Sequence, residues 1–225
     1  GRRVIPATMR LVQLTPRALI FDMDGLMVDS EPLWWSVERA LAAEHGKHWS
    51  DVLAHRCIGT GLPNTIQTMR AELGIDIGLE EGVSWLVDTF ITRIAELELK
   101  PGLDELVEAA SARGLRLAVA SSSTQRLVDV SLGRFELGPR FQAVVSGDMV
   151  ERLKPAPDIF LCAAERLEVE PGGCVVLEDS VAGVSAAVAA GMEVIAVPEL
   201  DGFAFVELTR HVVTDLYQAR ALLGL

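Results

Sequence analysis

The stretch from Arg17 to Gly25, Arg-Ala-Leu-Ile-Phe-Asp-Met-Asp-Gly, constrains the fold more than any other part of the chain. Its apolar residues 18–21 are typical of a buried parallel strand. Asp is a poor strand residue, so Asp22 and Asp24 mark the end of this strand, where Gly25 lets the chain turn. Ligands bind at the carboxyl ends of strands in open α/β sheets, and carboxylates there can hold Mg²⁺ or attack phosphorus. A plain loop that contains Asp is the alternative, and this segment alone leaves both open.

From residue 101 onward, the chain alternates between strand and helix patterns. The predicted strands are 115–120, 143–146, 174–177, 193–197 and 212–213, and the predicted helices are 103–113, 125–132, 157–167, 181–190 and 216–223. Gly114 and Gly191 stand where two of these helices end. Such an alternation predicts an α/β fold with a parallel sheet covered by helices on both faces.

The segment 31–98 has a different character, with no convincing strand. Helices are expected from Pro32 and near 50–57, 63–73 and 80–98, and all four tryptophans of the chain lie here. We therefore predict an inserted helical cap domain at 31–100, with a core domain made of 1–30 and 101–225. The chain would cross between the two at 28–32 and 101–102. The cap should lie over the carboxyl edge of the sheet, because it leaves from that edge and returns to it.

Composition narrows the class of protein. The formal net charge of −12 argues against a nucleic-acid-binding surface. The chain lacks an apolar run of about 18 residues, so we expect no membrane partner. Three cysteines without a C-x-x-C pair indicate reduced thiols, and hence a cytoplasmic protein. Residues 1–14 are expected to be mobile, and the protein is expected to be a monomer.

Polar side chains follow three of the predicted strands, and a lysine followed closely by two prolines lies between the second and the third. The residues are Asp22 and Asp24 after the strand 18–21, Ser121 and Ser122 after the strand 115–120, Lys154 in Leu-Lys-Pro-Ala-Pro, and Glu178 and Asp179 after the strand 174–177. One polar strand end can arise by chance, but three of them with such a lysine predict a site.

The chemistry of these residues fits phosphoryl transfer. Asp22 can attack phosphorus, and Asp24 can protonate the leaving oxygen and then take a proton from water. Mg²⁺ would take carboxylate oxygens of Asp22 and Asp179 and the backbone carbonyl of Asp24. Glu178 either binds the metal or orients a water on it.

The remaining candidates would bind the phosphoryl group. The hydroxyl of Ser121 and the amide of Ser122, at a helix N-terminus, suit phosphate oxygens. Lys154 would neutralise the charge on the phosphoryl group as the bond breaks. Gly25 belongs to the predicted phosphate- and substrate-binding set as the turn beside the two aspartates.

These motifs resemble those of the haloacid-dehalogenase-like (HAD) hydrolases. Phe-Asp-Met-Asp-Gly-Leu-Met-Val-Asp-Ser-Glu-Pro is similar to the first motif of that family, and Ser121, Lys154 and Glu178-Asp179-Ser180 resemble the second, third and fourth. The resemblance covers residues 17–197. It implies a Rossmann-like core, Mg²⁺ as cofactor and a helical cap after the first motif. The stretch 29–34, Asp-Ser-Glu-Pro-Leu-Trp, is most similar to phosphatases of sugar and hexitol phosphates.

The resemblance implies a Mg²⁺-dependent phosphatase of a small phosphorylated metabolite, acting through an aspartyl phosphate. The main rival within the family is a β-phosphoglucomutase-like mutase, which has a cap histidine where this chain has Trp34, and a lysine and an arginine in its cap loop. The stretch 57–63 has neither, and Ile58 and Leu62 cannot hold a second phosphate. A phosphoglycolate-type phosphatase and a binding protein without activity are two further rival functions.

Overall fold

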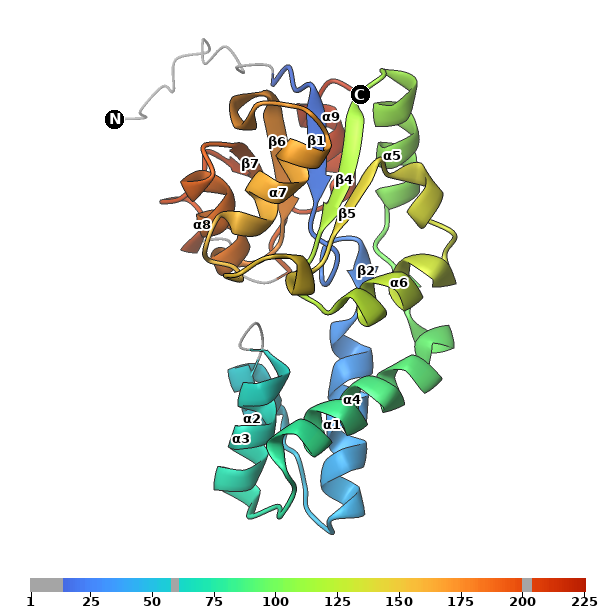
Figure 1. Ribbon diagram of the computed structural model, residues 1–225, viewed down its shortest axis with the longest axis vertical. Coiled ribbons are helices and arrows are strands. Elements are labelled where there is room, and N and C mark those ends of the chain that lie inside the picture. The colour runs from blue at the N-terminus through green and yellow to red at the C-terminus, as the bar shows by residue number, and fades with distance from the viewer. Residues whose placement is uncertain (1–13, 58–60, 200–203) are drawn as a thin grey trace, which may run out of the picture.

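A six-stranded parallel sheet forms the centre of the computed structural model, which describes residues 14–57, 61–199 and 204–225 (Figure 1). The strands stand in the order β5-β4-β1-β6-β7-β8. Their bounds are β1 Ala18–Phe21, β4 Arg116–Ala120, β5 Ala143–Val145, β6 Cys174–Glu178, β7 Glu193–Ala196 and β8 His211–Val212. The predicted α/β fold with a parallel sheet is confirmed.

Helices cover both faces of this sheet because its strands are apolar on both sides. Successive strand residues point to opposite faces, so Leu19 and Phe21 join one buried cluster and Ala18 and Ile20 join the other. The core helices are α5 Leu103–Ala112, α6 Gln125–Arg134, α7 Asp158–Arg166, α8 Val181–Ala189 and α9 Leu216–Leu222, with 3₁₀ turns at Gly138–Arg140, Gly147–Met149 and Pro171–Gly173. Each predicted helix and strand of the core is present, with ends that differ by one or two residues.

The register of the three central strands aligns the ends that carry the predicted site. Phe21, the last residue of β1, pairs with Val119 of β4 and with Leu177 of β6. Parallel strands in this register end at the same edge of the sheet. The residues that follow Phe21, Ala120 and Leu177 are therefore neighbours in space.

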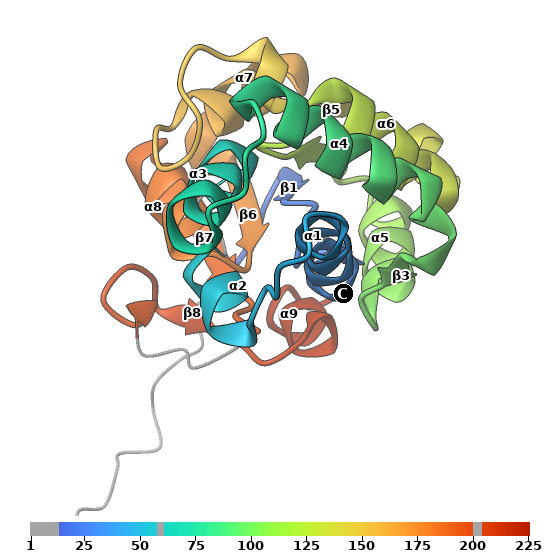
Figure 2. The ribbon, with the colours of Figure 1, turned by 90° about the horizontal axis from the view of Figure 1, so that it is seen from below.

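Within the described residues, four helices form the cap, which lies beyond the carboxyl edge of the sheet in Figure 1 and in front of the core when the molecule is seen from below in Figure 2. They are α1 Glu31–Glu44, α2 Asp51–Cys57, α3 Leu62–Leu73 and α4 Leu79–Thr92, followed by a 3₁₀ turn at Ile94–Glu96. Trp49, Ile66 and Phe90 are buried in the cap. Arg126 of α6 and Asp88 of α4 form an ion pair of 2.6 Å between core and cap.

Two short strands connect the cap to the core, and the sequence prediction missed both. β2 (Val28–Asp29) pairs antiparallel with β3 (Glu98–Leu99). The helix predicted over 80–98 ends at Thr92, and the segment 31–98, predicted to lack strands, ends in β3. β2 lies within the predicted crossing at 28–32, and β3 lies just before the predicted crossing at 101–102. Two-residue strands show no period of their own, and only pairing with a distant segment defines them.

The sequence analysis also predicted that residues 1–14 are mobile and that the protein has no membrane partner. Of the segment 1–14, only Leu14 lies within the described residues, where it is buried, so the prediction of mobility falls outside them. Within the three described ranges, every helix is too short or too polar to cross a bilayer.

A buried carboxyl group in the cap makes stability depend on pH. Glu38 of α1 is 5% exposed, and its Oε2 accepts a hydrogen bond of 2.8 Å from Trp49 Nε1. Burial raises the pKa of Glu38 to about 7, although Trp49 and Arg39 act in the opposite direction. The unfolded chain therefore loses this proton at a lower pH than the folded protein does.

We expect the free energy of unfolding to fall through Glu38 as pH rises from 4.5 to about 7, and to level off above. Below this window the carboxyl group is protonated in both states, so it contributes no difference. The shift corresponds to roughly 3 kcal/mol. Urea unfolding of Glu38→Gln measures it: relative to the variant, the wild type should lose about this amount between about pH 4 and pH 8. An equal pH dependence of both proteins would contradict the assignment.

Candidate active site

Asp22 occupies the end of the central strand, inside the protein. Its backbone N–H donates to Leu177 O at 3.0 Å, which continues the ladder between β1 and β6 by one residue. The residue is 6% exposed. A carboxylate buried at this depth needs a partner, because the loss of hydration disfavours the charged form.

Lys154 provides that partner. It lies in the loop after β5, before a cis Lys154–Pro155 bond, and its side chain is 7% exposed. The ammonium group donates to Asp22 Oδ1, to Glu178 Oε1 at 2.7 Å and to Ala120 O at 3.1 Å. Burial lowers the pKa of Lys154, but attraction to Asp22 and Glu178 outweighs burial and raises it overall. Three strand ends thus meet at one ammonium group.

Glu178 is fully buried, and both of its oxygens accept hydrogen bonds. Oε1 binds Lys154, and Oε2 accepts from the backbone N–H of Ser180 at 2.7 Å and from its hydroxyl at 2.9 Å. Ser180 Oγ in turn accepts from Gly183 N at 3.0 Å, at the N-terminus of α8. A Cβ atom on Gly183 would overlap the Glu178 carboxylate, so this position needs glycine.

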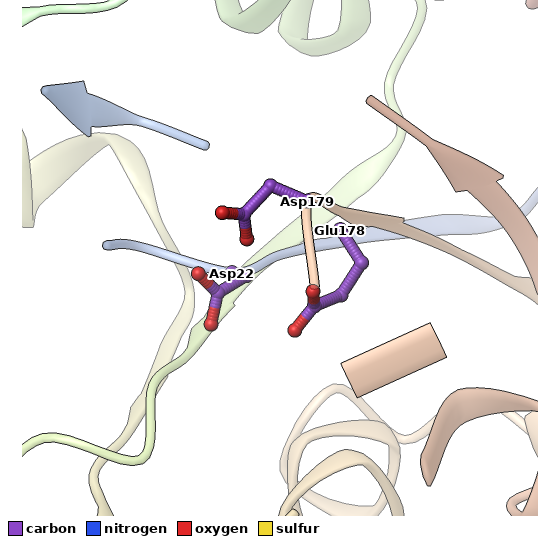
Figure 3. A group of neighbouring side chains, drawn as sticks. All are labelled: Asp22, Glu178 and Asp179. Carbon is purple, nitrogen blue, oxygen red and sulfur yellow. The ribbon is translucent and has the colours of Figure 1, made fainter. Parts of the chain in front are cut away.

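A group of three carboxylates has the composition of a magnesium site (Figure 3). Asp22, Glu178 and Asp179 each place one oxygen within 4.8 Å of the others. Burial and the neighbouring Glu178 and Asp24 raise the pKa of Asp22 to about 8, against the opposing effect of Lys154. Burial, with Asp22 and Glu178, also raises the pKa of Asp179 well above its usual range. One ammonium does not balance these carboxylates, whereas a bound divalent cation would do so.

The donor atoms are the hard oxygens that Mg²⁺ prefers, so the residues present fit this metal. Asp22 and Asp179 are the best candidates for direct ligands. Both oxygens of Glu178 are already hydrogen-bonded, so we expect Glu178 to orient Lys154 and the ligands rather than to bind the metal. Asp24 would contribute through its backbone carbonyl.

The Asp24 side chain is not part of the group of three carboxylates and faces the loop after β4. Its Oδ2 accepts hydrogen bonds from Ser123 Oγ at 2.8 Å and from Ser121 Oγ at 3.3 Å. Ser121 is buried, while Ser122 is exposed ahead of α6. The structure therefore places the Asp24 carboxylate beside the predicted phosphate ligand.

Gly25 has a positive φ of 84°, and a Cβ atom there would lie 2.9 Å from Asp179 Cγ. The turn after β1 thus needs glycine for its backbone conformation and for the space beside Asp179. The residue fits its predicted place at the site through this close approach.

The structure brings the eight predicted site residues to one edge of the sheet, and adds three that were missed. Ser180 and Gly183 hold Glu178, and Ser123 holds Asp24. Ser180 is part of the stretch Glu178-Asp179-Ser180 that resembles the fourth motif. Gly183 lies in the first turn of the following helix, where a glycine is a signal of close packing. Ser123 is the third serine of a run whose members look alike in sequence.

Comparison with known proteins identifies a family. Residues 19–197 match the family described as haloacid dehalogenase-like hydrolase. The phosphorylated carbohydrates phosphatase of Thermotoga maritima is 36% identical over 177 residues, covering 78% of this chain and 82% of that protein. Hexitol phosphatase B of Escherichia coli strain K12 is 33% identical over 229 residues, covering 93% and 99%.

A solved structure shows the same architecture. The crystal structure of a CbbY variant from Rhodobacter sphaeroides in complex with xylulose-(1,5)bisphosphate has a TM-score of 0.78 and 26% sequence identity to this chain. The match covers 89% of this chain and 95% of that one.

We expect Mg²⁺ to stabilise the protein through the carboxylates of Figure 3, since it relieves their mutual repulsion. At a hundredfold excess over its Kd, the stabilisation is about 2.7 kcal/mol. Thermal unfolding with Mg²⁺ and with EDTA measures the effect, which Asp179→Asn should abolish. Asp76→Asn, which changes an exposed carboxylate on the cap, should keep the full response. An unchanged melting temperature of the wild-type protein on addition of Mg²⁺ would rule out the magnesium site.

We expect Gly183→Ala to displace Glu178, and with it Lys154, because the new methyl group overlaps the carboxylate. A shift of about 1 Å in a catalytic group can cost about a hundredfold in rate. Hydrolysis of p-nitrophenyl phosphate reports the loss. Gly133→Ala in α6 is the matched control: its methyl group meets no atom within 4 Å, so activity should persist while stability rises by about 0.5–1 kcal/mol. Equal activities of the two variants would refute the role of Glu178.

Proposed function

The chain belongs to the haloacid dehalogenase-like hydrolases and is a phosphatase of that family, and we propose that it hydrolyses a small sugar phosphate or sugar-alcohol phosphate with Mg²⁺ as cofactor. The observation that carries the proposal is the buried contact of Lys154 with Asp22 and Glu178, at the sheet edge beneath the cap. The relation to a phosphatase of phosphorylated carbohydrates and to a hexitol phosphatase supports the substrate class.

Asp22 is the proposed nucleophile. Its carboxylate oxygen forms a bond to phosphorus while the ester bond breaks, and the bonding electrons leave on the alcohol oxygen. Lys154 stabilises the negative charge of the phosphoryl group during this transfer, in a site from which water is largely excluded. A Mg²⁺ ion bound by Asp22 and Asp179 would supply positive charge that keeps these carboxylates ionised and offsets the charge of the phosphate.

Asp24 is the proposed acid and base. Its carboxyl group gives a proton to the departing alcohol oxygen. The carboxylate then takes a proton from water, whose oxygen attacks phosphorus and breaks the bond to Asp22. Ser121, next to Asp24, would bind a phosphate oxygen with its hydroxyl, and Ser122 would do so with its backbone N–H at the start of α6.

Charge indicates that the rest of the substrate is neutral. Lys154 and three other described cations, in the loops and the helix next to the site residues, pair with carboxylates of the protein. The pairs are Lys154 with Asp22 and Glu178, Lys100 with Asp29 and Glu199, Arg126 with Asp88, and Arg152 with Asp158. The internal stretches outside the described residues, 58–60 and 200–203, contain neither Lys nor Arg. A second anionic group on the substrate would compete with these carboxylates for a cation, whereas hydroxyl groups would not.

Both rival activities would need a second position that binds an anionic group of the substrate. A phosphosugar mutase must hold a second phosphate, and a phosphoglycolate-type phosphatase must accept a carboxylate. Leu62, at the start of α3, packs half-buried against the apolar core, and Ile58 lies outside the described residues. Trp34 stacks on Phe90 of α4, with ring centroids 4.1 Å apart, so it belongs to the packing of the cap.

We expect the wild-type protein to release phosphate from glucitol 6-phosphate with Mg²⁺. The Asp22→Asn variant should release none, because it lacks the nucleophile, although Lys154 keeps its contact with Glu178. The kcat/KM for 6-phosphogluconate, which has a carboxylate on the same carbon chain, should be at least about tenfold lower. Higher ionic strength should reduce the difference in kcat/KM between the two substrates, because salt screens the repulsion of the added carboxylate.

Assays with further phosphate esters distinguish the proposed function from the rival activities. Hydrolysis of phosphoglycolate or fructose 1,6-bisphosphate with the same kcat/KM as glucitol 6-phosphate would contradict the proposal that the rest of the substrate is uncharged. Conversion of β-glucose 1-phosphate to glucose 6-phosphate without net phosphate release would show a mutase. Turnover by Asp22→Asn would overturn the covalent mechanism.

A further inference from the structure

The hydrogen bonds of Asp24 are unevenly shared between its two oxygens. Both contacts, from Ser123 Oγ and from Ser121 Oγ, reach Oδ2. Across the described ranges of the chain, Oδ1 receives no hydrogen bond. Because both hydroxyl groups donate to Oδ2, the other oxygen, Oδ1, is the one that can carry the proton of the carboxyl group.

The two serines are not equivalent partners. The contact from Ser123 is 2.8 Å, the usual length of a strong hydrogen bond between oxygens, whereas the contact from Ser121 is 3.3 Å. Ser121 Oγ also accepts from Ser123 N at 3.1 Å, and it is the side chain assigned to the phosphate. When Ser121 turns its hydrogen to a phosphate oxygen, Ser123 remains as the partner of Asp24.

We propose that Ser123 is a positioning residue for Asp24: its hydroxyl fixes Oδ2 and thereby presents Oδ1 to the leaving oxygen of the substrate. This inference rests on the proposed function, in which Asp24 is the acid and base. The proton on Oδ1 passes to the alcohol oxygen as the ester bond to phosphorus breaks. The charge left on the Asp24 carboxylate is then stabilised by the hydroxyl of Ser123.

The Ser123 hydroxyl is not needed to hold the loop in place. Backbone bonds already do so: Ser121 N donates to Val145 O at 3.0 Å, and Gly147 N donates to Ser123 O at 2.8 Å. The bond from Ser123 N to Ser121 Oγ is also independent of the Ser123 side chain. Removal of the hydroxyl should therefore change the acid and leave the loop unchanged.

The test compares leaving groups that do and do not need a proton. An alkoxide such as that from glucitol 6-phosphate needs protonation, whereas p-nitrophenolate leaves without it. A general acid contributes about 10²- to 10⁴-fold, so loss of its positioning should cost about tenfold or more. We expect Ser123→Ala to lower kcat/KM for glucitol 6-phosphate by this factor, and to change kcat/KM for p-nitrophenyl phosphate less than about threefold.

Three companion proteins make the result decisive. Ser123→Thr keeps a hydroxyl group and should retain most of the activity on glucitol 6-phosphate. Ser185→Ala removes a half-buried hydroxyl that donates to Val181 O in α8, and should behave like the wild type. Asp24→Ala should show the largest difference between the two substrates. The stabilisation by Mg²⁺ should persist in Ser123→Ala, because the metal carboxylates lie elsewhere.

The possible failures are distinguishable. An equal loss of Ser123→Ala on both substrates, or no loss on either, would overturn the positioning role if Asp24→Ala still discriminates between them. A Ser123→Thr variant as impaired as Ser123→Ala would also count against it. If Asp24→Ala itself affects both substrates equally, Asp24 is not the acid, and the proposed mechanism fails together with the inference.

Discussion

The contact of one ammonium group with two buried carboxylates is the interaction on which the rest of the site depends. Lys154 joins the ends of β1 and β6 to the loop after β5, and it also binds a carbonyl at the end of β4. Removing one partner of such a buried pair typically costs about 3–5 kcal/mol, because a charge remains without compensation. The geometry of Asp22 is therefore maintained by the same charges that would act on a phosphate.

Two separate networks share the edge of the sheet, and each fixes one carboxylate for one task. Glu178 and Ser180 hold Lys154 against Asp22, while the serines after β4 hold Asp24. The separation lets neighbouring aspartates in the same turn take different roles, because each meets a different electrostatic environment. Asp22 faces an ammonium group and other carboxylates, whereas Asp24 faces neutral hydroxyl groups.

The sequence predicted the sheet and the cluster well, because both follow from short-range patterns. Apolar runs with polar ends define β1, β4 and β6, and parallel strands bring such ends together whatever the details of packing. The missed features depend on the path of the backbone in three dimensions. Ser123 looks like its neighbours until the loop turns its hydroxyl to Asp24, and β2 and β3 are too short to show a period. The fit of Glu178 against Gly183 likewise appears only when the helix is placed.

The strand pair at the hinge makes the cap separable from the catalytic edge. Val28 lies opposite Leu99 and Asp29 opposite Glu98, so the chain leaves the core and re-enters it at neighbouring positions, with partner Cα atoms about 5 Å apart. A helical segment of different length or shape can replace the cap if its ends meet at this spacing, and Asp22 and Lys154 need not move. Substrate choice can then diverge, in evolution or by domain grafting, while the phosphoryl chemistry is inherited unchanged.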